Sequence, residues 1–364
     1  MRAQRLPSFK EFRPTPLLHR TAHVPQKARF PVIDAHNHLF ADMPAEEMVR
    51  IMDEAGVRIF VNVTGNCSVP FDQKGYVIRR RDMEVFKKGW VERCPGRFAY
   101  FTMAEFARWD DFTLDLDGEF TRQCIATLER EAREGALGLK VTKELGLRFK
   151  EPDGEIIRID DPRLYPVWKR AGDLGLPVLI HTSDPVGFFL PATPTNEHYG
   201  TLLDYPGWSF HDSRYSKGEL LDQRRRMMAD HPGTTFICPH VANNPEDLQW
   251  VSELLDALPN VCVDFSARMD ELGRQPYSAL DFFLQYQDRI LFGTDMPIST
   301  DMYRCHFRFL ETRDEYFDYP GYRGETDNAT RWKIYAIHLP DEVLQKVYSG
   351  NALRIIPGLK ELWK

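Results

Sequence analysis

Two histidines stand two residues apart in the segment VIDAHNHLF, at His36 and His38. If this segment is a β-strand, alternate side chains point to the same face, so the two imidazoles lie together, with Asp34 below them. Two imidazoles held in this way form a ready pair of ligands for a divalent ion such as zinc. A His-x-His pattern also arises by chance, so other residues must decide between a metal site and a structural role.

Further metal-competent or catalytic side chains follow short apolar segments along the chain. His181 ends the segment PVLIH, His240 ends TTFICPH and Asp295 ends RILFGTD, while Lys140 stands near the end of ALGLKV. Taken singly, such a histidine is often only a hydrogen-bonded strand-end residue, and such an aspartate is often a helix N-cap. Their occurrence at the ends of several strands favours one shared metal site.

The elements that must position these residues are eight short apolar runs that alternate with amphipathic stretches. The runs are residues 32–36, 57–63, 97–103, 136–141, 177–181, 234–240, 260–266 and 289–295. Between them, apolar residues recur at the three- and four-residue spacing of amphipathic helices. Strands that are apolar on both faces are typical of a parallel sheet under helices, and eight of them predict a single (β/α)8 TIM barrel of the α/β class. The strand ends of such a barrel meet at one mouth.

Three segments lie outside this repeat. Residues 1–30 are basic and contain proline but no signal-like apolar stretch, so we expect a surface arm before a barrel over residues 31–364. Residues 182–216 and 296–325, after the fifth and eighth strands, show no clear helical period, and long loops at a barrel mouth usually form lids or binding walls. A final helix within residues 339–356 is expected to close the barrel.

Three residues are candidates for substrate binding. Arg268 leaves the seventh strand towards the mouth, where its guanidinium can take a carboxylate bidentately. An ion pair with Asp264 or Asp270 is an equal alternative. Trp208 and His211 lie in the loop after the fifth strand, where they either line an aromatic pocket or pack the loop down.

The composition excludes several classes of function. The 54 acidic and 47 basic side chains give a net charge of −7, which offers no electrostatic basis for binding nucleic acid or an anionic membrane. No apolar run is long enough to span a bilayer. Six scattered cysteines without a CxxC pair favour a reducing, cytoplasmic location, although a signal peptide removed earlier would leave the same chain. The run RRRMM, residues 224–228, is expected to carry solvated charge on a helix.

The order of HNH after VID, then GLK, IH, PH, GTDMP and the closing NALRII resembles the amidohydrolase superfamily. Within it, the chain is similar to the amidohydrolase-related family 2 of metal-dependent hydrolases and decarboxylases, over about residues 30–356. The resemblance implies that His36, His38 and His181 are metal ligands. It also implies that Asp295 is both a ligand and the base that takes a proton from the metal-bound water.

His240 and Lys140 each keep alternative roles. His240 either completes a second metal site or polarises the substrate carbonyl and moves protons. In binuclear members of the superfamily a fourth-strand lysine is carboxylated and bridges two ions. Lys140 could instead bind a substrate oxyanion, or be solvated at the rim. In the branch that the chain resembles one ion is more usual, so we expect one divalent ion, zinc before manganese.

Together these features predict an enzyme, a metal-dependent hydrolase acting on an ester, lactone or amide bond of a small carboxylated or aromatic substrate. The alternative is a metal-dependent non-oxidative decarboxylase of an aromatic or unsaturated carboxylic acid, in which Asp295 or His240 protonates carbon. Lys140 favours hydrolysis, since decarboxylating relatives generally lack this Gly-Leu-Lys. A barrel that only binds a ligand is a third, less favoured hypothesis. We expect the protein to bind a small molecule as its partner. We also expect it to assemble as a homodimer.

Overall fold

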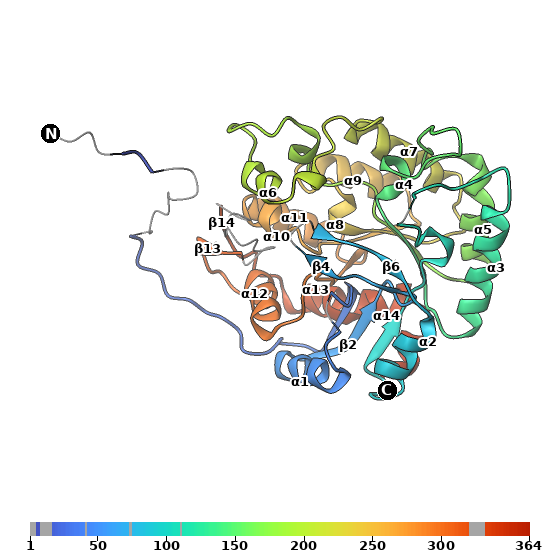
Figure 1. Cartoon of the computed structure of the whole chain (residues 1–364). Coiled ribbons are helices and arrows are strands. Elements are labelled where there is room, and N and C mark those ends of the chain that lie inside the picture. The colour runs from blue at the N-terminus through green and yellow to red at the C-terminus, as the bar shows by residue number, and fades with distance from the viewer. Residues whose placement is uncertain (1–4, 8–16, 41, 73–74, 110, 320–331) are drawn as a thin grey trace.

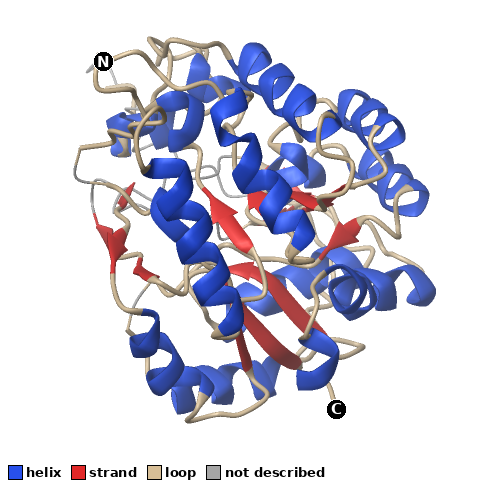
Figure 2. Ribbon diagram, turned by 90° about the vertical axis from the view of Figure 1, so that its right-hand side faces the viewer, coloured by secondary structure: helices blue, strands red, loops and turns tan. Residues whose placement is uncertain are grey.

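The computed structural model describes residues 5–7, 17–40, 42–72, 75–109, 111–319 and 332–364. Short parallel strands lie at its centre and helices surround them (Figures 1 and 2). The central strands are β1 (Val32–Asn37), β2 (Val57–Asn62), β7 (Phe98–Tyr100), β8 (Leu139–Val141), β9 (Val178–Ile180), β10 (Phe236–Cys238), β11 (Val261–Asp264) and β12 (Ile290–Leu291). Each of the eight runs predicted as strands contains one of them.

Backbone hydrogen bonds close these strands into a ring. Regular pairing forms one sheet of β1, β2 and β7 and another of β8 to β12 in chain order. Between β7 and β8, the Lys140 N–H donates to the Thr102 carbonyl (2.7 Å), and between β12 and β1 the Ala35 N–H donates to the Phe292 carbonyl (2.9 Å). The chain is therefore a TIM barrel of the α/β class, as predicted.

Amphipathic helices cover the outside of the barrel because their apolar faces pack on the outward side chains of the strands. They are α1 (Ala45–Ala55), α2 (Met83–Phe86) with the π-helical turn η1 (Lys87–Val91), α3 (Phe120–Arg133), α5 (Tyr165–Asp173), α7 (Lys217–Ala229), α9 (Leu248–Ala257) and α11 (Pro276–Gln285). The predicted final helix is α13 (Asp341–Gln345), η6 (Lys346–Gly350) and α14 (Asn351–Ile355). Its Ile355 and the following Leu359 join the apolar cluster inside the barrel.

The prediction of a long loop over residues 296–325 omitted a helix, α12 (Thr300–Glu311). Ser299 caps this helix by accepting a hydrogen bond from the Met302 N–H (3.1 Å). Met302, Tyr303, Phe307 and Leu310 recur at helical spacing on its buried face, so the sequence carries the pattern of this helix and the prediction overlooked it. Among the described residues after α12, β13 (Phe317–Asp318) pairs with β14 (Lys333–Ile334) in an antiparallel ribbon. Residues 320–325 of the predicted loop lie outside the described residues.

The loop after β9 is built of short pieces, η4 (Val186–Phe189), α6 (Tyr199–Asp204) and η5 (Pro206–Trp208). Asn196 fastens it by donating to the Gly187 carbonyl (2.7 Å) and accepting from the His198 N–H (2.9 Å). A Cβ at Gly187 would lie 2.6 Å from the His198 ring, so only glycine permits this approach. The loop is thus held in one shape by its own contacts.

Two small antiparallel ribbons, which were not predicted, follow β2. They pair β3 (Cys67–Ser68) with β6 (Arg79–Arg80) and β4 (Phe71–Asp72) with β5 (Gly75–Tyr76). A Cβ at Gly75 would lie 2.5 Å from the Trp208 Nε1. The ribbon after β2 therefore contacts the loop after β9, on the side of the barrel where the strands end (Figure 1).

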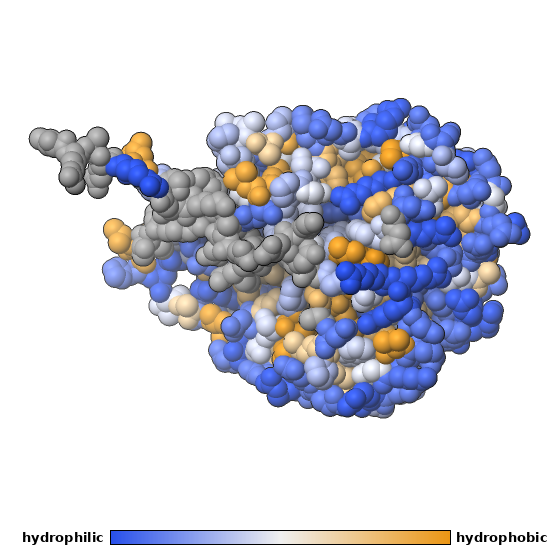
Figure 3. Space-filling model, viewed as in Figure 1, coloured by the Kyte–Doolittle hydropathy of each residue, from blue (hydrophilic) through white to orange (hydrophobic). Residues whose placement is uncertain are grey.

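The N-terminal segment 17–31 contains no helix or strand and runs along the outside of the barrel (Figure 1). His23 pairs with Asp314 (2.6 Å), and Arg29 donates to Asp341 (2.6 Å). The face shown in Figure 3 is mainly hydrophilic, with small apolar patches. In the described part of the chain, no helix is both long and apolar enough to cross a membrane.

The expectation that residues 224–228 carry only solvated charge is wrong for Arg224. This side chain is fully buried and donates to the Ala242 carbonyl and to the Asn243 Oδ1, both at 2.6 Å. Arg225 is exposed. A buried arginine of this kind joins helix α7 to the turn that follows β10.

Candidate metal centre and cavity

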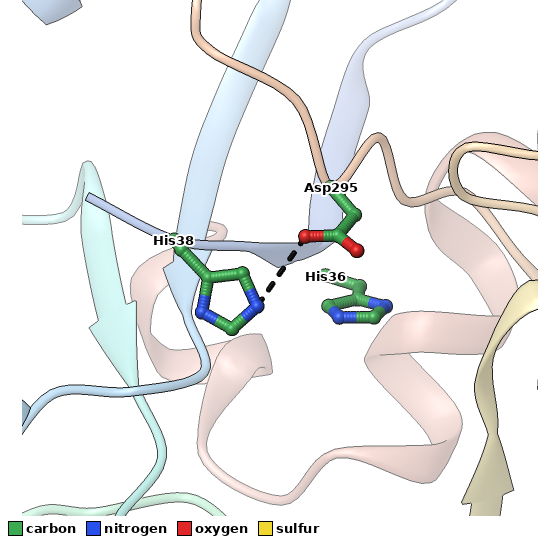
Figure 4. A group of neighbouring side chains, drawn as sticks. All are labelled: His36, His38 and Asp295. Carbon is green, nitrogen blue, oxygen red and sulfur yellow. Dashed lines mark ion pairs between the residues drawn. The ribbon is translucent and has the colours of Figure 1, made fainter. Parts of the chain in front are cut away.

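Three predicted ligands meet at the mouth of the barrel. His36 lies in β1, His38 directly follows β1, and Asp295 stands four residues beyond the end of β12 (Figure 4). One ligand atom from each of the three lies within 4.8 Å of the others, and the His38 Nε2 is 3.3 Å from the Asp295 Oδ1. The two-residue spacing on β1 therefore places both imidazoles beside the carboxylate, as the alternation of strand side chains requires.

The backbone around Asp295 is shaped to bring its side chain to β1. The Asp295 N–H donates to the His36 carbonyl (2.9 Å), and Asp295 itself has a left-handed φ of 48°. A Cβ at Gly293 would lie 2.8 Å from the His36 Cβ, so a glycine is needed where the two chains approach. Left-handed non-glycine residues are uncommon and cluster at functional sites.

Buried hydrogen-bond partners orient the first two imidazoles. The His36 Nδ1 lies 2.9 Å from the Asp264 Oδ2 at the end of β11, and the His38 Nδ1 lies 2.9 Å from the Thr64 Oγ1. Burial alone would raise the pKa of Asp264, but the charge and hydrogen bond of His36 lower it to about 2. Asp264 therefore accepts from the Nδ1 of His36, so the Nε2 carries the lone pair that a metal ion would take and that the Lys140 amine contacts in this structure (3.2 Å).

His240 lies on the other side of the same carboxylate. Its Nε2 is 3.5 Å from the Asp295 Oδ2, without the geometry of a hydrogen bond, and its Nδ1 is 2.8 Å from the Ser266 carbonyl. His240 begins four consecutive residues with positive φ, which turn the chain sharply after β10. Asp295 thus lies between His38 and His240.

His181 lies beside these residues but does not join the group of three. Its ring centroid is 4.6 Å from that of His240. Its Nε2, however, lies 3.1 Å from the Ser183 carbonyl and 3.5 Å from the Asp184 Oδ1. The predicted fourth ligand is therefore at the correct strand end, with this nitrogen directed to the loop after β9.

Lys140 is buried inside the barrel and is not solvated at the rim, so that one of its predicted alternatives is wrong. Only 1% of the residue is exposed, and its Nζ lies 3.2 Å from the His36 Nε2. Burial lowers the pKa of Lys140 to about 8. This amine therefore shares the centre of the site with the ligand atoms.

Burial sets the protonation of the remaining groups. It lowers the pKa of His38 and of His240 well below the usual value and that of His181 to about 3, so these imidazoles are neutral at pH 7. It also raises the pKa of Asp295. Neutral imidazoles are the form that binds a metal, and a basic carboxylate is a better proton acceptor.

This donor set fits a divalent ion. Two imidazoles and one carboxylate are borderline and hard ligands that zinc and manganese both accept. No residue in the described part of the chain hydrogen-bonds the buried His240 Nε2, which is costly unless a ligand or ion engages it. His36, His38 and Asp295 would hold the ion.

A cavity of about 770 Å³, which includes space open to solvent, extends outward from this centre. The metal-centre residues that line it are His181, His240 and Asp295. The loop after β9 contributes Asp184, Pro185, Phe188, His198, Thr201 and Trp208, the segment after β11 contributes Ala267, Arg268, Asp270 and Glu271, and Tyr76, Lys143 and Tyr319 complete the lining. The loop expected to form a binding wall therefore does line the cavity.

The three predicted substrate-binding residues differ in their placement. Arg268 and Trp208 line the cavity, but His211 is exposed and is not among the lining residues. The Arg268 Nη2 lies 3.5 Å from the Asp184 Oδ1, so its carboxylate neighbour is neither of the two that the sequence suggested. Trp208 stacks on Tyr205 with ring centroids 4.4 Å apart, so it both lines the cavity and packs the loop.

Sequence reasoning missed three charged residues of the lining, Glu271 and the pair Lys143 and Asp184. The last two lie close together. They form a buried ion pair, and Lys143 lowers the pKa of Asp184 well below its usual range although burial opposes this. Both stand within three residues of a predicted ligand or catalytic residue, in GLKVTK and IHTSD. This proximity to a predicted strand end was the feature of the sequence that could have identified both residues as part of the site.

The barrel and its histidine–carboxylate centre are those of the metal-dependent TIM-barrel enzymes. Comparison with known proteins agrees with this class. The family model described as amidohydrolase matches residues 33–358. The chain therefore belongs to this amidohydrolase family. No curated protein matches the chain.

Solved structures share the fold at low sequence identity. A 2,6-dihydroxybenzoate decarboxylase from Rhizobium is 18% identical, with 91% of this chain and 99% of that chain covered and a TM-score of 0.52. A dihydroxybenzoic acid decarboxylase from Polaromonas sp. JS666, with bound manganese and the inhibitor 2-nitroresorcinol, is 16% identical (90% and 96% covered, TM-score 0.51). A 4-oxalomesaconate hydratase from Rhodopseudomonas palustris is 16% identical (91% and 97% covered, TM-score 0.50).

Proposed function

We propose that the protein is a metal-dependent hydrolase that cleaves an ester, lactone or amide bond of a small carboxylated or aromatic molecule. The observation that supports this most is the position of Asp295, whose carboxylate lies 3.3 Å from the His38 Nε2 and 3.5 Å from the His240 Nε2. One carboxylate at this place can act both as a ligand and as a proton acceptor. We propose a single ion, zinc before manganese.

When bound, a divalent ion lowers the pKa of a coordinated water towards about 7 and polarises a carbonyl oxygen. Asp295 takes the proton of the attacking water, and its raised pKa suits this task. His240 is neutral, and its Nε2 is free of hydrogen bonds in the structure described, so it is placed to pass that proton to the leaving group. The two residues form a short proton path across the site.

Lys140 is the third catalytic residue in this proposal. Its amine lies 3.2 Å from the His36 Nε2, so a carbonyl oxygen directed to the centre of the site would also meet this amine. A positive charge there stabilises the negative charge that develops on the oxygen during attack. If the amine is carboxylated instead, it becomes a further ligand, and mass spectrometry of the intact protein would show the added mass.

Decarboxylation of an aromatic acid is the second candidate, and the composition of the cavity favours it. Phe188 and Trp208 stack at a centroid distance of 6.2 Å, and Arg268 lies in the same lining. An aromatic wall beside an arginine suits an aromatic carboxylate. In this case Asp295 or His240 delivers a proton to carbon. Two solved structures with this fold are decarboxylases of dihydroxybenzoates.

The two candidates are separated by measuring two products at once. Zinc- or manganese-loaded protein is assayed on panels of esters, lactones, amides and aromatic acids, with released carboxylate and released carbon dioxide recorded separately. We expect hydrolysis that falls by about 10²–10⁴ in kcat in Asp295→Asn. The control is Asp301→Asn, because that side chain is 95% exposed on α12.

Carbon dioxide release without any hydrolysis would overturn the first candidate in favour of the second. Turnover of neither panel by metal-loaded protein would contradict both. Unchanged hydrolysis in Lys140→Met would remove Lys140 from the catalytic set. The proposed binding partner of the protein is thus a small molecule, and we propose no nucleic acid or membrane as a partner. Homodimerisation stays a prediction, which light scattering can test by measuring the mass of the protein in solution.

A further inference from the structure

The wall of the cavity formed by His198, Asp270 and Glu271 has no assigned role in the proposed chemistry. Asp270 and Glu271 lie in the first turn of α10 (Met269–Gly273), which follows β11, and His198 precedes α6 in the loop after β9. All three line the cavity that Asp295 and His240 also line. We call these three residues the acid wall.

The acid wall is buried, although one side-chain polar atom of each of its residues has no hydrogen-bond partner among the described residues. Asp270 and Glu271 are only 7% and 4% exposed, and the side chain of His198 is 10% exposed. Among the described residues, no hydrogen bond reaches the Asp270 Oδ1, the Glu271 Oε2 or the His198 Nε2. Buried polar atoms are otherwise nearly always paired, and leaving one unpaired is destabilising.

The neighbouring cations do not satisfy these atoms. Arg274 Nε lies 3.9 Å from the Asp270 Oδ1, beyond hydrogen-bonding distance, and Arg274 bonds instead to Glu197 (2.8 Å). Among the charges near Arg268, Glu271 does most to raise the pKa of its guanidinium. The Arg268 Nη1 nevertheless donates to the Ala267 carbonyl (2.6 Å), and no described residue pairs with its Nε. The acid wall is therefore not a closed ion-pair network.

The two carboxylates also repel each other. Burial and the adjacent Glu271 raise the pKa of Asp270 to about 7. Such an arrangement is destabilising for the empty protein, since two adjacent buried acids, each with one oxygen that no described residue pairs, cost free energy. Costs of this kind are typical of sites that are completed by a ligand.

We propose that the acid wall is a subsite for a hydrogen-bond-donating group of the substrate, a hydroxyl or an amine, on the part of the molecule that points away from the metal centre. The inference rests on the proposed function and narrows its substrate class to small hydroxylated or aminated acids. The carboxylate or carbonyl end lies towards Asp295 and Arg268, and the donor end reaches Asp270 and Glu271 in the same cavity.

An anionic group is disfavoured at the acid wall by the two carboxylates, and an apolar group would leave their oxygens unpaired. A donor pairs with them and removes that cost. A hydroxyl needs only an acceptor oxygen, whereas an ammonium ion also needs the negative charge. The two kinds of donor can therefore be distinguished by a variant that keeps the oxygen and removes the charge.

The test measures binding, not turnover. Isosteric benzoates that carry methyl, hydroxyl or amino groups at the 3- or 4-position, together with 4-(aminomethyl)benzoate and 4-ethylbenzoate, are titrated calorimetrically into zinc-loaded protein at fixed pH. We expect at least one donor-bearing acid to bind about tenfold or more tightly than its alkyl isostere. If donors bind no more tightly than their isosteres, or if none of the acids binds, the proposal is overturned.

Variants assign the preference to the acid wall. Glu271→Leu removes the acceptor and should abolish the donor preference, while Glu271→Gln should keep a hydroxyl preference and lose an ammonium preference. Asp301→Asn is the control, because that side chain is 95% exposed on α12 and does not line the cavity. A preference that survives in Glu271→Leu and in Asp270→Leu would refute the acid wall as its source. Turnover on the ester and aromatic-acid panels is a separate readout, so either proposal can fail without the other.

Discussion

Replacement of Asp264 by asparagine tests whether the buried carboxylate behind His36 controls metal binding. The Asp264 Oδ1 accepts hydrogen bonds from the His240 N–H (3.1 Å), the Ser266 N–H (3.0 Å) and the Ser266 hydroxyl (2.5 Å), while the Oδ2 accepts from the His36 Nδ1 (2.9 Å). An asparagine keeps its single oxygen towards the three donors, so its NH2 group faces the His36 Nδ1.

That reversal moves the proton of the His36 ring. With a donor opposite it, the Nδ1 must become an acceptor, and the proton transfers to the Nε2, the nitrogen that a metal ion needs. Loss of a partner of this kind typically weakens metal affinity by about 10–100-fold, which corresponds to roughly 1.4–2.7 kcal/mol. We expect Asp264→Asn to fall in this range.

The assay is a competition between the protein and a chromophoric chelator for zinc, with circular dichroism to show that the metal-free variant is folded. Asp314→Asn is a matched control, since Asp314 is a buried carboxylate paired with His23 (2.6 Å) in a contact that involves none of the predicted ligands. It should lower stability without changing the Kd for zinc. A folded Asp264→Asn with a Kd within twofold of the wild type would refute the argument.

Two further predictions concern stability. Burial lowers the pKa of His306 to about 4, so its folded pKa is below the unfolded value near 6.5, and its stabilising effect is complete above pH 6.5 and is lost as the pH falls towards 4. When the pH falls from 7.5 to 5, we expect this residue to lower the free energy of unfolding of the wild type by about 2 kcal/mol. The urea midpoint of His306→Leu should therefore fall less than that of the wild type over the same pH range. Equal falls in both proteins would contradict this. Arg224→Met should lose about 3 kcal/mol of unfolding free energy in urea, because the Ala242 carbonyl then lacks its donor, whereas the exposed Arg225→Met should change it by less than about 0.5 kcal/mol. Equal stability of the two arginine variants would show that the buried contact contributes nothing.

The fold could be predicted because strand positions depend on local apolar runs. All eight runs contain a strand, and the spacing of His36 and His38 placed both imidazoles on one face. Helix α12 has a regular apolar period and could have been predicted. The ribbons after β2 could not, because each of their strands has only two residues.

Side-chain direction was the main part of the site that the sequence could not determine. His181 is at the predicted strand end, yet its Nε2 faces the Ser183 carbonyl, a matter of rotamer and of the loop that follows. The acid wall depends on α10 and the loop after β9 meeting at one cavity, and no local pattern specifies that contact. His211 lies in the same loop but on its exposed side.

The contact between the first and last strands of the barrel determines when the metal centre can form during synthesis of the chain. The Thr294 N–H donates to Asp34, 260 residues earlier in the chain, and the neighbouring residues His36 and Asp295 belong to the metal centre. A ribosome-bound chain therefore cannot present the complete centre until its eighth strand has emerged. Because an ion that binds only the closed barrel shifts the folding equilibrium towards it, metal supply would act on the last step of maturation and on the lifetime of the finished barrel.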